Sequence, residues 1–198
     1  MTRATAILAA VLTVSTGTLF SAETRGDAAR GERLFTEFLC IKCHSVGGRG
    51  GSSAPSLPVR RDAPFTPAAM AGAMWSHAAK MWQAADRAGI RIPAFSEQQA
   101  ADLHAFVAGV SAPADGAVDK ARGRGVYEAK LCASCHDEPM MGAPSLSGQA
   151  GRFSAFRMMS ALSTHGRGML SRMAARHTDW QILSSREMGD LIAYLNSK

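Results

Sequence analysis

Two stretches of the chain, residues 94–107 and 182–195, have the spacing of apolar and polar positions that predicts an amphipathic helix. A leucine and an aromatic residue three positions later supply the apolar face of each helix: Leu103 and Phe106, and Leu191 and Tyr194. Each stretch also contains a serine followed three positions later by glutamine or glutamate, as in a capping box: Ser96 with Gln99, and Ser184 with Glu187. The match between the two stretches indicates an internal repeat.

The repeat extends to the segments before these helices. RGERLFTEFLCIKCH, at 30–44, aligns with RGRGVYEAKLCASCH, at 122–136, and APSL follows in both copies. The alignment matches a glycine and an aromatic residue in each copy: Gly31 with Gly123, and Phe35 with Tyr127. Each half of the chain therefore carries the same order of motifs.

The segment between the two copies, residues 110–123, is rich in small residues, proline and glycine, which is typical of a linker. We therefore expect two domains, residues 23–112 and residues 113–198. Because each would carry a full set of motifs, we expect each to bind its cofactor when it is produced alone.

Residues 1–22 have the features of a signal peptide. Arg3 precedes an apolar run from about Ala4 to Phe20, and small residues follow before the chain becomes polar at Glu23. An uncleaved anchor is the alternative, although a run of roughly 17 residues is at the short end for spanning a bilayer. We expect cleavage near Ala22, a periplasmic protein, and no transmembrane segment in the mature chain.

The four cysteines lie in two C-x-x-C-H motifs, Cys40–Cys43–His44 and Cys132–Cys135–His136. This motif is typical of covalent attachment of a c-type haem. Two thiols three positions apart can form thioethers with the two vinyl groups of the porphyrin, and the adjacent histidine can bind the iron. A thioredoxin-like pair would need only one copy, and the two halves of a zinc ribbon would lie closer together along the chain. The sequence therefore predicts two haem c groups, with iron bound by His44 and His136.

The order of glycine-aromatic helix, C-x-x-C-H, proline loop and leucine-aromatic helix resembles class I cytochrome c, and it occurs twice. This resemblance implies an all-α fold of two tandem cytochrome c-like domains, each a small helical fold around one haem. In that family the first and last helices cross closely at a small residue, which would be Gly31 and Gly123 here. The family's proline carbonyl, which accepts a hydrogen bond from the axial histidine, would come from Pro55 and Pro144.

The ligand on the far side of each iron departs from the family pattern. Class I cytochromes usually carry a methionine in a pattern like M-P-x-F before the last helix, where this chain has Ile92 in IPAF and has WQIL in the second half. The middle segments, residues 70–90 and 158–178, align and share three pairs of potential ligands: Met70 and Met158, His77 and His165, and Met81 and Met169. We expect Met81 and Met169 to bind the irons, with the two histidines or the first methionine pair as alternatives, and an open coordination position as a further one.

The chain lacks a Gly-rich phosphate loop, a nucleophile elbow and a His-Glu metal motif. The formal charge of +6 would fall close to neutrality once Arg3 and four haem propionates are counted, which argues against nucleic-acid binding. Five arginines in the second half suggest either docking to an acidic redox partner or a solvated helix face: Arg152, Arg157, Arg167, Arg172 and Arg176.

We therefore expect a dihaem protein without catalytic residues that transfers single electrons between redox partner proteins. The alternatives are a dihaem enzyme of the peroxidase or thiosulfate dehydrogenase type, and a haem subunit of a larger oxidoreductase. All four cysteines are needed for thioethers, so no thiolate is left for covalent sulfur chemistry.

Overall fold

The computed structural model describes residues 24–58, 64–109, 114–137, 142–149 and 151–198. Within these residues helices predominate and the only strands form one short hairpin, which confirms the predicted all-α class. The helices are α1 (Ala28–Glu37), η1 (Cys40–Lys42, a 3₁₀ turn), α2 (Pro67–Arg87), α3 (Glu97–Ala108), α4 (Lys120–Ala129), α5 (Ala133–His136), α6 (Ala155–Ala174) and α7 (Ser185–Leu195). A short hairpin, β1 (Ser45–Val46) with β2 (Arg49–Gly50), follows η1.

The helices begin where the sequence supplies a capping side chain. Six of them have an Asp, Ser or Thr side chain that accepts a backbone N–H of the first turn: Asp27, Thr66, Ser96, Asp119, Ser154 and Ser184. Both predicted capping boxes, Ser96 with Gln99 and Ser184 with Glu187, are present. None of the helices in the described ranges is long and apolar enough to cross a membrane. The predicted signal peptide lies outside these ranges.

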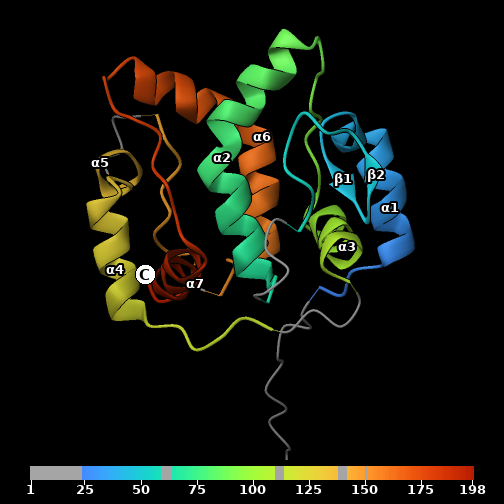
Figure 1. Cartoon of the computed structure of the whole chain (residues 1–198). Coiled ribbons are helices and arrows are strands. Elements are labelled where there is room, and N and C mark those ends of the chain that lie inside the picture. Colours follow the sequence, from blue (N-terminus) through green and yellow to red (C-terminus); the bar gives the residue numbers. More distant parts are fainter. Residues whose placement is uncertain (1–23, 59–63, 110–113, 138–141, 150) are drawn as a thin grey trace, which may run out of the picture.

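Two helix pairs, α1 with α3 and α4 with α7, form the two sides of the molecule (Figure 1). Glycine allows each pair to approach closely. A Cβ atom on Gly31 would lie 2.0 Å from the Asp102 carbonyl oxygen, and one on Gly123 would lie 1.9 Å from that of Asp190. Both predicted crossings are therefore confirmed.

Each crossing is also held by an aromatic pair and by an ion pair. The ring centres of Phe35 and Phe106 lie 5.5 Å apart, and those of Tyr127 and Tyr194 lie 5.3 Å apart. The ion pairs join an arginine of the first helix to a buried aspartate of the last: Arg30 Nε to Asp102 at 2.9 Å, and Arg122 Nε to Asp190 at 2.8 Å. Each aspartate also accepts a backbone N–H, from Asp27 and from Asp119 respectively. These carboxylates tie the start of one helix to the middle of the other.

The Asp190 carboxylate predicts a pH-dependent contribution to stability. The hydrogen bond from Arg122 holds the pKa of Asp190 below its usual value, against burial, which raises it. Because the folded-state pKa is depressed, the stabilisation is present above the unfolded pKa, about 3.9, and is lost as the pH falls through the folded value. Asp190→Asn should therefore lower the free energy of unfolding at pH 7, and the difference from the parent protein should shrink below about pH 4. Denaturant titrations at several pH values measure this, and a pH-independent difference would contradict it.

The long helices α2 and α6 cross between these two pairs (Figure 1). Helix α2, from the first half, lies mainly against α7 and α6, and α6, from the second half, lies against α2 and α3. Each long helix therefore packs on the last helix of the other half. The sequence did not predict this exchange, because the repeat alone places each long helix with the rest of its own half.

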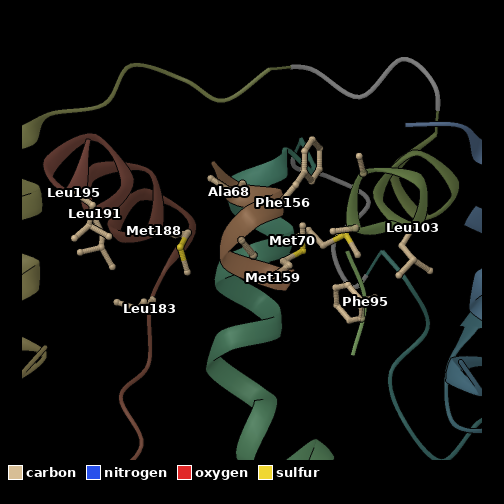
Figure 2. Close-up of a cluster of buried hydrophobic side chains, with 14 of the residues drawn as sticks. Ala68, Met70, Phe95, Leu103, Phe156, Met159, Leu183, Met188, Leu191 and Leu195 are labelled. Atoms are coloured by element: carbon tan, nitrogen blue, oxygen red, sulfur yellow. The ribbon is translucent and has the colours of Figure 1, made fainter. Parts of the chain in front are cut away.

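The exchange joins the buried side chains of both halves into one core. Figure 2 shows Met70 and Met159 between Phe95 and Leu103 on one side and, on the other, Leu183 with the α7 residues Met188, Leu191 and Leu195. The predicted division into residues 23–112 and 113–198 stays a prediction. Its boundary falls at residues 110–113, outside the described ranges.

Candidate functional site

Each C-x-x-C-H motif lies on a tight turn directly after the first helix of its half. The residue before the first cysteine, Leu39 or Leu131, has a φ of 62°, in the left-handed region that leucine rarely adopts. The backbone N–H of His44 then donates to the Cys40 carbonyl at 2.9 Å, and that of His136 to the Cys132 carbonyl at 3.0 Å. The two motifs therefore form similar tight turns, the 3₁₀ turn η1 in the first half and the short helix α5 in the second, and each places its two cysteines and its histidine close together.

All four cysteines are free thiols and are partly exposed. Burial raises the pKa of Cys40 and of Cys132 to about 11. Two unpaired thiols on one turn suit thioether formation with the two vinyl groups of one haem.

The two motif histidines are oriented by proline carbonyls, as predicted. His44 Nδ1 lies 2.8 Å from the Pro55 oxygen, and His136 Nδ1 lies 2.8 Å from the Pro144 oxygen. Because a carbonyl can only accept, Nδ1 donates in both cases and Nε2 carries the lone pair. Such an outer bond fixes the tautomer and makes the imidazole a better metal ligand.

His77 of α2 lies opposite His44. The two ring centres are 6.3 Å apart, and the ring planes are nearly perpendicular. His77 Nδ1 donates to the Ala73 carbonyl, one turn earlier in α2, so its Nε2 also keeps a lone pair. Burial lowers the pKa of His77, the bond to Ala73 raises it, and the neighbouring His44 ring lowers it further.

In the second half, His165 of α6 aligns with His77 in the repeat. Burial lowers the pKa of His165, and the charge of His136 adds to this effect, because the two side chains are close. Ring contact is therefore observed for His44 with His77, whereas His165 is linked to His136 only by the effect of its charge.

The separation of the rings fits a haem iron. Metal–imidazole bonds measure about 2 Å in protein sites, and the ring nitrogen lies about 1 Å from the ring centre, so two imidazoles on opposite sides of one metal ion have centres about 6 Å apart. The 6.3 Å between His44 and His77 agrees with this distance. The donor set, two thiols and two imidazoles, suits a covalently attached haem.

Two family models match the chain, one in each half. The model described as cytochrome c matches residues 28–111, and the model described as cytochrome C oxidase, cbb3-type, subunit III, matches residues 118–195. The chain belongs to the class I c-type cytochrome family. No curated protein and no solved structure matches the chain.

The candidate methionine ligands of this cytochrome lie in different surroundings. Met70 is buried among Phe95, Leu103 and Phe156, and Met158 packs against the same core (Figure 2). Met81 is partly buried beside Trp82 and Leu162, and Met169 is partly exposed on α6, one turn after His165. The assignment of Met81 and Met169 as ligands stays a prediction.

The predicted basic docking surface includes one arginine with a structural role. Arg167 forms an ion pair with Asp86 at 2.9 Å and lies over the Trp82 ring, so it holds α6 to α2. Arg152, Arg157 and Arg172 are exposed. Arg167 is exposed as well, so the ion pair does not remove it from the surface, and docking to an acidic partner stays a prediction.

Sequence reasoning missed the two buried aspartates and the serines that join the halves. The repeat could have revealed the two aspartates, because Asp102 and Asp190 occupy matched positions in it. Their partners Arg30 and Arg122 are matched as well. The serines Ser76 and Ser163 do not align strictly in the repeat, and their partners lie in the opposite half. The two serines meet these partners only because α2 and α6 each pack against the opposite half.

Proposed function

We propose that this cytochrome carries two haem c groups and transfers single electrons between redox partner proteins in the periplasm. The observation that carries the proposal is the doubled arrangement of a cysteine pair, a histidine held by a proline carbonyl, and a second histidine on a long helix. Cys40 and Cys43 would attach one haem and Cys132 and Cys135 the other, with His44 and His136 as proximal ligands. Bound haem supplies one-electron chemistry between ferrous and ferric iron.

For the far side of each iron we propose His77 and His165. Three features of His77 support this: its ring faces His44 at a distance that suits one metal ion, its Nδ1 is occupied by the Ala73 carbonyl, and its Nε2 lone pair is available. His165 holds the matched position beside His136. A methionine ligand raises the reduction potential of a c-type haem, so bis-histidine ligation predicts lower potentials than Met81 and Met169 would give.

A haem subunit of a larger oxidoreductase is the second candidate function. The match of residues 118–195 to a model named for an oxidase subunit favours it. The same haem sites would serve in either case, and co-purification of a stable partner would distinguish a subunit from a free carrier. An enzyme of the peroxidase type would need a labile position at one iron, which bis-histidine ligation does not provide.

Export to the periplasm rests on residues 1–22, with Arg3 before an apolar run. Haem attachment and export can be tested together on protein purified from a host with cytochrome c maturation machinery. We expect the mass of the chain from about residue 23 plus two haems, and a pyridine haemochrome assay that gives two haems per chain. One haem per chain, or zinc without iron, would contradict the proposal.

A further inference from the structure

We propose that each haem site is positioned by the opposite half of the chain, through side chains of the exchanged helices α2 and α6. Ser76 and Trp75 of the first half would hold the wall of the second haem site, and Ser160 and Ser163 of the second half would hold the wall of the first. This inference rests on the proposed dihaem function and adds residues that bind no haem themselves.

The contacts of α2 lie on the segment before α7. The Ser76 hydroxyl donates to the Leu183 carbonyl at 2.8 Å and accepts the Leu183 N–H at 2.9 Å. Trp75 Nε1 donates to the Gln181 carbonyl at 2.9 Å, and Trp180 Nε1 donates back to the Trp75 carbonyl at 2.7 Å. The two indole rings stack with centres 5.1 Å apart. Residues 180–183 are thus fixed to α2 by four hydrogen bonds.

The contacts of α6 lie at the matched place in the first half, the segment before α3. The Ser163 hydroxyl accepts the Phe95 N–H at 3.0 Å, and the Ser160 hydroxyl donates to the Phe95 carbonyl at 2.8 Å. Phe95 and Leu183 occupy the same position of the repeat. The exchange is therefore reciprocal, with serine hydroxyls holding both backbone groups of one residue in each half.

These two segments adjoin the haem-attachment turns. The Phe95 ring stacks on Phe38, two residues before Cys40, with centres 6.1 Å apart. Leu183, at the matched position of the second half, belongs to the buried core against which Cys132 and Ala133 pack. Both segments precede the last helix of their half, where class I cytochromes carry the distal methionine.

In α2, neighbouring residues contact the two different halves of the chain. Ser76 holds the second site, and His77, the next residue, faces His44 in the first. On α6, Ser163 holds the first site and His165 lies beside His136 in the second. Because a helix moves as a rigid element, displacing α2 or α6 at one site also displaces the side chains that hold the other.

The inference predicts effects that cross between the halves. Ser76→Ala in the full-length dihaem protein leaves the Leu183 N–H and carbonyl without their partner and should shift the electron paramagnetic resonance signal and the midpoint potential of the second haem more than those of the first. Ser163→Ala should shift the first haem more than the second. The two signals can be assigned with His77→Ala and His165→Ala. Ser76→Thr, which keeps the hydroxyl, should return the second haem towards the parent values.

Ser171→Ala is the matched control, because Ser171 is exposed near the end of α6. It should leave both signals unchanged. Variants with two haems that shift only the haem of their own half, or neither haem, would overturn the inference while leaving the proposed function intact. Failure of the parent protein to bind two haems would instead overturn the proposed function.

Discussion

Gly123→Ala should be among the most destabilising single substitutions in this protein. The added Cβ would lie 1.9 Å from the Asp190 carbonyl oxygen and 2.8 Å from Cβ of Tyr194, and neither backbone can move without separating α4 from α7. Overpacking of this kind commonly costs 1–3 kcal/mol, and a clash with backbone at this distance should cost more than about 3 kcal/mol. Thermal or denaturant unfolding of the holoprotein, followed by circular dichroism, measures the loss.

Gly125→Ala provides the control within the same helix. No atom lies within 4 Å of the Cβ that it would add, so the substitution should stabilise α4 by about 0.5–1 kcal/mol through backbone entropy. Equal effects of the two substitutions would mean that the close crossing of α4 and α7 does not form.

His77→Ala should remove the distal ligand from one of the two irons. About half of the iron should then change from low spin to high spin, or acquire the near-infrared charge-transfer band of sulfur ligation if Met81, one turn later, takes its place. The second haem should keep its ligands, because His165 lies on the other long helix. Electronic absorption and electron paramagnetic resonance spectra of the oxidised variant measure both outcomes.

Two controls separate ligation from a general effect of substitution. His177→Ala changes an exposed histidine in the turn after α6 and should leave the spectrum of both haems unchanged. Met81→Ala should do the same. A low-spin spectrum that survives His77→Ala without any change, together with a spectrum altered by Met81→Ala, would assign the ligand to Met81.

The elements of each half were predictable because their determinants are local or repeated. Gly31 and Gly123 have the same spacing from their cysteines, and the capping serines and proline loops recur at matched positions. Residues that recur at matched positions are those on which the structure of each half depends. The repeat therefore predicted the helix crossings and the proline carbonyls that accept hydrogen bonds from His44 and His136.

The exchange of α2 and α6 was not predictable in the same way. A repeat gives the same residues to both halves, so a helix that packs in its own half and one that packs in the other leave the same pattern. The choice between His77 and Met81 has a similar cause, because residues four apart share one face of a helix. The choice between these two ligands depends on the position of α2 relative to η1. That position is set by Ser76, Trp75 and the core of the opposite half.

The near-infrared spectrum of the oxidised, unmodified protein tests the central claim most directly. The account predicts two low-spin haems per chain without the charge-transfer band of sulfur ligation, because the proposed ligands His77 and His165 would complete both irons. Its electron paramagnetic resonance signals should accordingly be those of bis-histidine haem. A sulfur band that corresponds to both haems would contradict this account and assign the irons to methionine.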